Sequence, residues 1–487
     1  MSRKTILTLL GLTALAALAR FATLDLQSFH HDEAVTAGQV LDPGLGATLD
    51  QVAGGERSPP LYYILAWGWS TLFGTGEVGL RSLSALIGTL MVPAAFFCGR
   101  ALASERVGLT AALFFALNPY LVWYSQEARS YILMALFATI AIWGLARWDR
   151  EGDHRSLWIW ALGSAGALLS HYFAAFLIVP QALWLLLRGE RRPVLRPVAA
   201  VAVVGIALVP LALAQQGSDR REGFTDRPVA ERVLEVGLNY VASEDPDPLS
   251  GSGKVDAVQI GAGMGGLVLA ALAAWIFFRR PPADEGQEDT GRERYAAARL
   301  AALAAIAIAV PAVLALAGLD LLNPRNLLAI VVPVLLVGAL IFGGTRDRLA
   351  LAGLAATAAL FAAVVLAFNL SAEMQREDWR GAAEAMGEPD GARIVVAPKN
   401  GDDPLELYLD AAKFEGGRFE DGLEVSEILA LGTGGGVSVP AGFESASTLP
   451  LPPLFELESF ESSAPRTVTP ADFEGATGGR FVVLIDR

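Results

Sequence analysis

Long apolar runs, each about the length needed to cross a lipid bilayer, recur along this chain of 487 residues. A helix needs about 20 mostly apolar residues to cross the hydrocarbon core, with a range of about 17 to 25. The run at 157–188 is too long for one such helix, so we predict two short crossings that meet near His171. About eleven crossings are predicted, at 5–24, 79–98, 107–124, 130–147, two within 157–188, 195–214, 257–278, 297–317, 326–343 and 348–368.

The composition excludes several other classes of protein. Charged residues make up 18% of the chain and the mean hydropathy is +0.44, whereas soluble globular proteins carry about 25% charged residues. The single cysteine, Cys98, cannot build a disulfide framework or a cysteine zinc site. Nucleic-acid binding is disfavoured because the chain has no basic stripe. We therefore predict an α-helical polytopic membrane protein whose first crossing is retained, since no convincing cleavage site follows it.

The apolar run 59–73 decides the topology. As a helix it extends only about 20 Å, too short to cross, so we predict a helix in the membrane interface. Its aromatic side chains, Tyr62, Tyr63, Trp67 and Trp69, are then expected to form an interfacial belt. This choice gives the inner connections about twice as many Arg and Lys residues as the outer ones, as the positive-inside rule requires. The amino terminus is thus predicted to be cytoplasmic in a plasma (inner) membrane, and the carboxyl-terminal part extracytoplasmic.

The segment 369–487 differs from the rest of the chain. It holds 9 Lys and Arg residues and 22 Asp and Glu residues, and so carries nearly all of the formal charge of −14. A helix is predicted around 376–386 and strands at 392–398 and 480–486. We expect two domains: a transmembrane catalytic domain, 1–368, and a small acidic α/β extracytoplasmic domain, 369–487.

The predicted topology gathers unusual polar residues on the outer side of the membrane. Ionisable residues at membrane depth are costly, so such a gathering is a functional hypothesis. The residues are His31, Asp32 and Glu33 in the first outer loop, Arg57 before the interfacial helix, Glu127 and Arg129 after the third crossing, His171 and Tyr172 between the two short crossings, and Arg325 before the tenth crossing.

Each of these residues allows two interpretations. Asp32 and Glu33 are either solvated loop acids or a base with a supporting carboxylate. His171 is either a buried, hydrogen-bonded histidine or a ligand of metal or phosphate. These three residues are the candidates for a divalent cation site, and the sequence leaves the need for a cation open.

The arginines likewise have structural and functional interpretations. Arg129 either pairs with Glu127 or binds an anionic phosphate through its guanidinium fork. Arg325 is either an interfacial anchor or a second phosphate ligand, and Arg57 is a third candidate.

Several motifs, taken in order, resemble one family. The acids of the first outer loop are followed by PPLYY, RSLSALIGTLMVPAAFFCGRAL, NPYLVWYSQEARSYIL, SHYFA, NPRNLLAIVVP and REDWRGAA. Together they resemble polyprenyl-phosphate-sugar glycosyltransferases of the GT-C type. The resemblance is greatest to bacterial relatives of protein O-mannosyltransferases and of the lipid A aminoarabinose transferase. Where relatives carry His or Lys before the Pro-Pro pair, this chain has Ser58, and it lacks the WWD motif of oligosaccharyltransferases.

The resemblance implies transfer of a monosaccharide from a polyprenyl-phosphate donor to an acceptor hydroxyl at the outer face. It implies that Asp32 is the base, accompanied by Glu33, and that Arg129 and His171 lie in family motifs of the pocket. The negative charge of the departing phosphate needs stabilisation, for which Arg129 and Arg325 are the candidates. A single displacement inverts the anomeric centre. The expected pocket residues are His31, Tyr62, Tyr63, Glu127, His171 and Tyr172.

Two competing functions remain open at this point. A transporter or flippase of lipid-linked sugars would need ionisable residues along a path through the membrane, and the predicted crossings contain few. A non-catalytic assembly or receptor protein would act through the acidic domain alone. The sequence specifies neither the sugar nor the acceptor, which can be a protein, a lipid or a glycan.

Overall fold

The computed structural model of the chain contains two compact units. It describes residues 1–41, 44–188, 191–215, 228–243, 257–279, 288–389, 391–409, 414–415, 422–432, 440–452, 454–469, 471–473 and 481–486. The membrane unit comprises Met1–Leu24, Asp42–Glu244 and Lys254–Ala367. The C-terminal unit comprises Asp25–Leu41, Asp245–Gly253 and Phe368–Arg487. The first outer loop thus belongs, by its contacts, with the carboxyl-terminal residues.

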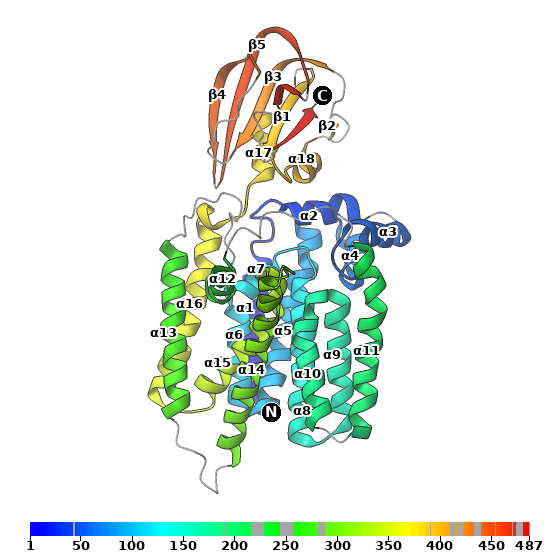
Figure 1. The fold of residues 1–487 in the computed structure, drawn as a ribbon. Coiled ribbons are helices and arrows are strands. Elements are labelled where there is room, and N and C mark those ends of the chain that lie inside the picture. Colours follow the sequence, from blue (N-terminus) through cyan, green and yellow to red (C-terminus); the bar gives the residue numbers. More distant parts are fainter. Residues whose placement is uncertain are drawn as a thin grey trace. The chain divides into compact units, whose positions relative to one another are not determined.

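The membrane unit is built from α-helices (Figure 1). They are α1 (Arg3–Phe21), α3 (Leu45–Gly55), α4 (Leu61–Phe73), α5 (Glu77–Leu102), α6 (Glu105–Leu117), α7 (Pro119–Ser125), α8 (Tyr131–Glu151), α9 (His154–Ser170), α10 (Ala175–Arg188), α11 (Arg191–Ala214), α12 (Val229–Ala242), α13 (Ala257–Arg279), α14 (Glu288–Leu316), α15 (Val331–Gly343) and α16 (Arg348–Leu370), with the 3-10 turns η2 (Tyr172–Ala174) and η4 (Arg325–Ile330).

Helices occupy all the predicted crossing positions, and the multi-pass class is confirmed. Within the described residues, eight helices have the length and composition to cross a membrane, and α6 with α7 makes a ninth. The eleven predicted crossings therefore include two helices that are shorter than the length used for these nine. The run 157–188 does divide at His171, but α9 has 17 residues and α10 has 14. The fold class, helical with a small C-terminal α/β domain, is as predicted.

The run 59–73 forms the short helix α4, which has 13 residues. Its predicted aromatic belt is wrong in part, because Tyr62 and Tyr63 are fully buried within the protein. Trp67 and Trp69 are half-buried, and Trp69 Nε1 donates to Ser82 Oγ at 2.9 Å. One face of α4 therefore packs on α5, and of the four predicted belt residues only the two tryptophans are partly exposed.

The break between α6 and α7 is stabilised by a buried arginine. Pro119 has no N–H group to continue the helix, and the two helices bend by 57° at this point. Two carbonyls at the end of α6 accept instead from Arg20, Phe115 O from Nη2 at 2.9 Å and Ala116 O from Nη1 at 3.0 Å. Gln126 in turn donates to the carbonyl of Arg20 at 3.2 Å, at the end of α1. Arg20 of α1 thus satisfies carbonyls at the end of α6, and Gln126, which follows α7, satisfies one at the end of α1.

Gly88→Ala is expected to destabilise the membrane unit by about 1–3 kcal/mol, because the packing has no room for a methyl group. A Cβ at this position of α5 would overlap Ser125 Oγ and lie 2.8 Å from Arg20 Nε. Gly68→Ala in α4 is the matched control, since a Cβ there meets nothing within 4 Å. Thermal denaturation in detergent micelles measures both variants, and equal midpoints would contradict the close packing at Gly88.

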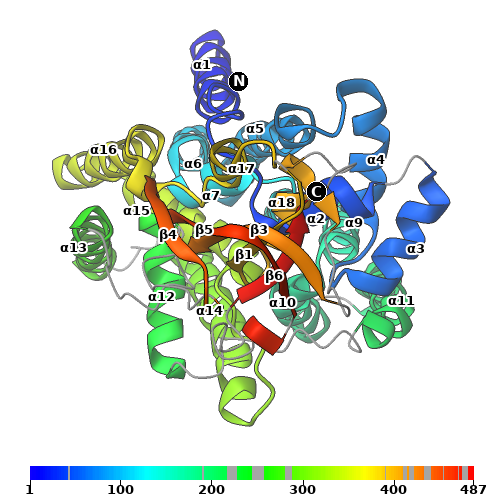
Figure 2. The same ribbon diagram turned by 90° about the horizontal axis from the view of Figure 1, so that it is seen from above.

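The C-terminal unit contains a sheet of six strands in the order β2-β6-β1-β3-β5-β4 (Figure 2). β1 pairs parallel with β3 and antiparallel with β6, so Val395 lies beside Leu429 and Leu484. The elements of the unit are α2 (His31–Val35), the π-helix Thr36–Val40, the 3-10 turn Ala372–Met374, α17 (Trp379–Met386), β1 (Arg393–Pro398), α18 (Asp402–Tyr408), β2 (Phe414–Glu415), β3 (Leu423–Gly432), β4 (Glu444–Leu451), β5 (Phe455–Val468) and β6 (Phe481–Asp486). The predicted helix and both predicted strands are confirmed.

Both faces of this sheet are covered by apolar side chains. Alternate residues of β1 point to opposite faces, as a strand requires. Val395 packs with Trp379 of α17 and Leu405 of α18 on one face, and Ile394 packs with Phe460 on the other. The C-terminal unit therefore has a core of its own.

Candidate functional site

A buried ion pair connects two segments of the membrane unit that were predicted to lie on its outer side. Glu56 directly follows α3, and Arg129 lies two residues before α8. Arg129 Nη1 donates to Glu56 Oε1 at 2.9 Å, and Nη2 donates to Oε2 at 3.0 Å. Tyr63 of α4 donates its hydroxyl to Glu56 Oε2 at 2.8 Å, and its ring lies 5.9 Å from the guanidinium. This bidentate geometry is the strong form of an arginine–carboxylate pair.

Glu56 is the residue of this site that the sequence analysis missed. The sequence offered Glu127 as the partner of Arg129, and the backbone N–H of Arg129 does donate to the carbonyl of Glu127 at 2.8 Å. The side-chain ion pair with Glu56, however, crosses 73 positions of sequence. The available signal was an acid beside Arg57, three residues before Pro59 in the segment that leads into α4.

His171 lies at the turn between α9 and η2 and is 4% exposed. Its Nδ1 accepts the N–H of Phe173 at 3.3 Å, which leaves the ring proton on Nε2. Burial, and then the positive charges of Arg129 and Arg325, lower the pKa of His171 to about 3. The imidazole is therefore neutral at physiological pH, and its Nε2–H is a hydrogen-bond donor.

Arg325 begins η4 and is half-buried. Its backbone N–H donates to Asn323 Oδ1 at 3.1 Å, which fixes the start of this turn. Because the charges of Arg129 and Arg325 both act on His171, these three predicted residues meet in one region of the membrane unit. They come from three separate turns of the chain. The structure thus brings these three predicted residues together, whereas their roles and the wider gathering stay predictions.

The other predicted residues of this unit have different surroundings. Tyr172 donates its hydroxyl to Gln215 Oε1 at 2.8 Å, and Gln215 Nε2 donates to the carbonyl of Ser58 at 3.3 Å. Tyr62 is buried, with its hydroxyl 3.3 Å from Ser84 Oγ. Glu127 is buried at 4% exposure and Arg57 is exposed. Gln215 thus ties the turn after His171 to the segment that precedes α4.

The predicted carboxylates Asp32 and Glu33 belong to the C-terminal unit. They lie in the first turn of α2, where Glu33 is completely buried. Glu33 Oε2 accepts the backbone N–H of His30 at 3.1 Å and forms an ion pair with Arg376 at 3.3 Å. Asp32, by contrast, is half-buried. Glu33 therefore has contacts that fix the start of α2, one residue away from Asp32.

Contacts from the segment before and within α17 hold the loop that carries Asp32. Ser28 Oγ donates to the carbonyl of Glu377 at 2.9 Å and accepts the N–H of Trp379 at 2.9 Å. The N–H of Phe29 donates to the hydroxyl of Tyr408 at 2.7 Å. The two contacts of Ser28 connect this loop to the REDWRG motif, and the contact of Phe29 connects it to α18.

Two of the candidate metal ligands already have partners within their own units. Glu33 is engaged by His30 and Arg376, and His171 uses Nδ1 to accept a backbone N–H. In the part of the chain that the structure describes, the one group with metal-like spacing is His31, Asp402 and Asp403, whose ligand atoms lie within 4.8 Å of one another. His31 Nδ1 is 3.4 Å from Asp403 Oδ2.

Acidification from pH 6.5 toward pH 3 is expected to destabilise the membrane unit through His171. The unfolded chain takes up a proton near the ordinary pKa of 6.5, whereas the folded imidazole stays neutral to about pH 3. The contribution of the neutral imidazole to the free energy of unfolding is therefore complete above pH 6.5. It is lost as the pH falls, at up to about 1.4 kcal/mol per pH unit. His171→Asn should lose less stability over this window in thermal denaturation. An unchanged pH profile in that variant would contradict the burial of a neutral imidazole.

The comparisons with known proteins point to the family that the motifs resemble. Residues 57–214 match the family model of dolichyl-phosphate-mannose-protein mannosyltransferases. This range contains Arg57, Arg129 and His171, together with the helices α4 to α11. A comparison with curated proteins gives no match. The recognition made from the motifs is thus confirmed over the central part of the membrane unit.

Solved structures of three related enzymes are similar to the chain at low sequence identity. The protein O-mannosyltransferase complex Pmt1-Pmt2 of S. cerevisiae, bound to the sugar donor, is 18% identical over 45% of this chain and 34% of that chain, with a TM-score of 0.36. The oligosaccharyltransferase of Archaeoglobus fulgidus is 14% identical over 79% and 56%, with a TM-score of 0.43. ArnT of Cupriavidus metallidurans is 15% identical over 82% and 84%, with a TM-score of 0.40. The match covers about a third of the yeast chain and just over half of the archaeal one.

Proposed function

We propose that this protein is an integral-membrane glycosyltransferase. It moves a monosaccharide from a polyprenyl-phosphate donor to an acceptor hydroxyl at the outer membrane face. The observation that carries the proposal is the meeting of Arg129, Arg325 and neutral His171 in one region of the membrane unit. Two of these residues lie within the range that matches the mannosyltransferase family model.

Cleavage of the bond between sugar and phosphate requires stabilisation of the negative charge on the departing phosphate. Arginine is suited to this task, because its planar guanidinium binds phosphate oxygens in pairs. Glu56 already takes two donors of Arg129, so in this proposal Arg129 supplies positive charge from a fixed position. Arg325 is the direct phosphate ligand. The Nε2–H of His171 donates a hydrogen bond to an oxygen of the sugar-phosphate substrate.

The acceptor hydroxyl must lose a proton as it attacks the anomeric carbon. In this proposal the carboxylate of Asp32 accepts this proton and is a neutral carboxylic acid after the transfer. The new carbon–oxygen bond forms as the bond to phosphate breaks, and one such displacement inverts the anomeric centre. Glu33 acts through the capping of α2 and is thus a positioning residue, held by Arg376.

A divalent cation has no assigned step in this proposal. Arginines can supply the positive charge that a cation would supply, and the predicted ligands Glu33 and His171 have other partners. The inner membrane and the extracytoplasmic position of the acidic segment belong to the proposal as well. They rest on the charge of the connecting loops.

A transporter of lipid-linked sugars is the alternative, and it is not favoured. Such a protein needs polar side chains along the membrane path. Two buried arginines of the crossings, Arg20 and Arg81, lie instead near helix ends, where Arg20 Nη1 donates to Ala116 O and Arg81 Nη1 donates to Leu24 O. Arg20 donates as well from Nε to Ser125 Oγ at 3.0 Å, so contacts within the protein engage its guanidinium.

The test is sugar release by the purified full chain in lipid, with a panel of radiolabelled polyprenyl-phosphate monosaccharides and candidate acceptors. Release of sugar from one donor, with an inverted product, supports the proposal. If folded protein neither hydrolyses any donor nor transfers its sugar, the proposal is contradicted. Uptake of intact donor into the vesicle lumen supports the transporter. A parallel reaction with a chelator measures the need for a divalent cation.

A further inference from the structure

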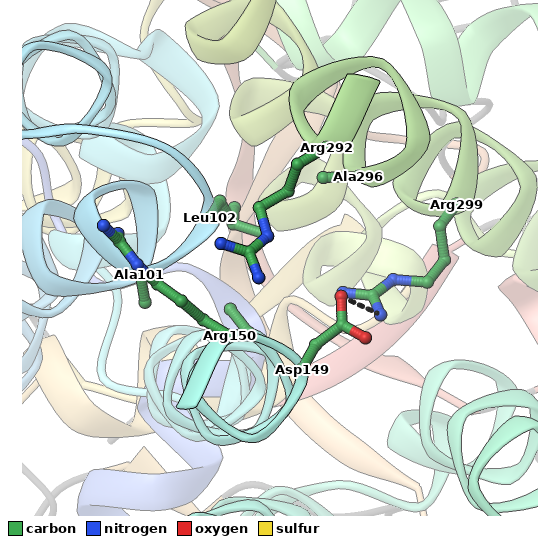
Figure 3. A pocket seen from close by; sticks show the side chains of 8 residues that line it. Ala101, Leu102, Asp149, Arg150, Arg292, Ala296 and Arg299 are labelled. Carbon is green, nitrogen blue, oxygen red and sulfur yellow. Dashed lines mark ion pairs between the residues drawn. The ribbon is translucent and has the colours of Figure 1, made fainter. Parts of the chain in front are cut away.

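A small pocket opens at the opposite end of the membrane unit from His171. Figure 3 shows the side chains that line it, which come from the ends of α5 and α8 and from the first half of α14. The lining residues are Ala101, Leu102, Ala146, Asp149, Arg150, Arg292, Ala296 and Arg299. The lining thus contains three guanidinium groups and one carboxylate, and the pocket carries net positive charge.

The arginines of the pocket are held in different ways. Arg150 donates to two carbonyls at the end of α5, those of Arg100 at 2.6 Å and Ala103 at 3.2 Å. Arg299 stacks over the ring of Trp184 at 4.6 Å. Both guanidinium groups are therefore fixed before any ligand arrives, which lowers the entropy cost of binding.

Two of the arginines have binding capacity left. Arg299 Nη1 is buried and lies 3.4 Å from Asp149 Oδ2, yet it makes no hydrogen bond within the described part of the chain. Arg292 is exposed and forms no ion pair with any described residue. Its guanidinium extends toward Leu102 and the middle of the pocket (Figure 3). An anionic oxygen placed between these groups would satisfy the buried donor and offset the excess charge.

The pocket lies at the ends of helices that are long enough to cross a membrane, where we expect lipid headgroups. α5 and α8 are helices of crossing length, and Leu102 and Asp149 stand at or near their carboxyl ends. α10 packs against α14 beside the pocket and exposes apolar side chains, with Leu187 86% exposed and Leu183 54% exposed. Exposed leucines next to a charged pocket fit a ligand that has acyl chains and an anionic head.

We propose that this pocket binds the phosphate group of an anionic membrane lipid. Arg292 and Arg299 contact the phosphate oxygens, and Arg150 contributes charge. The acyl chains lie along the exposed leucines of α10. A free phosphate ion shares the same head chemistry, but it gains nothing from the leucines. The pocket is independent of the proposed transfer reaction, since none of its residues takes part in that site.

The test is native mass spectrometry of the full chain in detergent, titrated with dioleoyl phosphatidylglycerol or dioleoyl phosphatidylcholine. Wild-type protein is expected to bind phosphatidylglycerol at least tenfold more tightly than phosphatidylcholine. Arg292→Gln should weaken phosphatidylglycerol binding about fivefold, because one arginine near a lipid phosphate contributes about that factor. Arg299→Gln should weaken it at least as much.

Arg155→Gln is the matched control, because Arg155 is exposed at the start of α9 and does not line the pocket. Its affinity should stay at the wild-type value. Arg292 is exposed, so its variant tests the proposal even where Arg299→Gln fails to fold. Wild-type affinity in the Arg292 variant, or an equal loss in the control, overturns the proposal. Displacement of the lipid by millimolar inorganic phosphate identifies free phosphate as the ligand and overturns the assignment to a lipid.

Discussion

Asp32→Asn is expected to lower sugar transfer by about 10²- to 10⁴-fold, the usual contribution of a general base. Asparagine keeps the size of the side chain but cannot take the proton of an acceptor hydroxyl. The fold should persist, because Asp32 is half-buried and the loop is held through Ser28 and Phe29. The measurement is the initial rate of transfer from a radiolabelled donor by protein in lipid.

Asp50→Asn provides the matched control for this substitution. Asp50 is an exposed carboxylate of α3, and its neutralisation removes the same charge from the chain. Its rate should remain within twofold of wild type, about the scatter of such an assay, since the proposed mechanism gives this exposed carboxylate no part in proton transfer. Normal transfer by the Asp32 variant would show that another group takes the proton.

Glu56→Gln is expected to destabilise the membrane unit by about 3–5 kcal/mol, the usual cost of removing one partner of a buried ion pair. The substitution leaves the guanidinium of Arg129 buried without its counter-charge, and it weakens the hydrogen bond from Tyr63. Chemical denaturation in detergent micelles, followed by tryptophan fluorescence, gives the free energy of unfolding. The double variant Glu56→Gln, Arg129→Gln should recover part of the loss, because both charges are then absent.

Glu151→Gln is the control for this second prediction. Glu151 pairs with Arg147 at 2.8 Å on α8, and its side chain is 47% exposed. Exposed pairs of this kind contribute less than about 1 kcal/mol, because water screens the charges. Equal losses for the buried and the exposed pair would refute the stabilising role of the Glu56–Arg129 contact.

The sequence predicted the helices well, because run length and charge are local properties. Hydrocarbon thickness fixes the length of a crossing, and so the positions from 5–24 to 348–368 all contain helices. The burial of Tyr62 and Tyr63 was not predicted, since an aromatic residue at a membrane surface can face lipid or protein. Whether the two tyrosines face lipid or protein depends on packing against α5, and the sequence of the run does not determine that packing.

The site could be predicted in part. Arg129, His171 and Arg325 were assigned to one side of the membrane from topology, and the structure brings them into electrostatic reach. The partner Glu56 was not predicted, because tertiary pairing over 73 positions leaves no periodic signal. The neutral state of His171 also follows only from burial and two nearby charges, which no sequence spacing reveals.

The ion pair between Glu33 and Arg376 has a consequence for folding during synthesis. The two residues lie 343 positions apart, and the ribosome produces the loop of Asp32 long before it produces that arginine. A growing chain can insert its apolar helices in order, yet α2 acquires its last contacts only when the C-terminal unit has emerged and folded. A polypeptide interrupted before Arg376 would carry the membrane helices and the acid, but not the contacts that hold the acid in place. Completion of synthesis is thus a condition for assembling the proposed base.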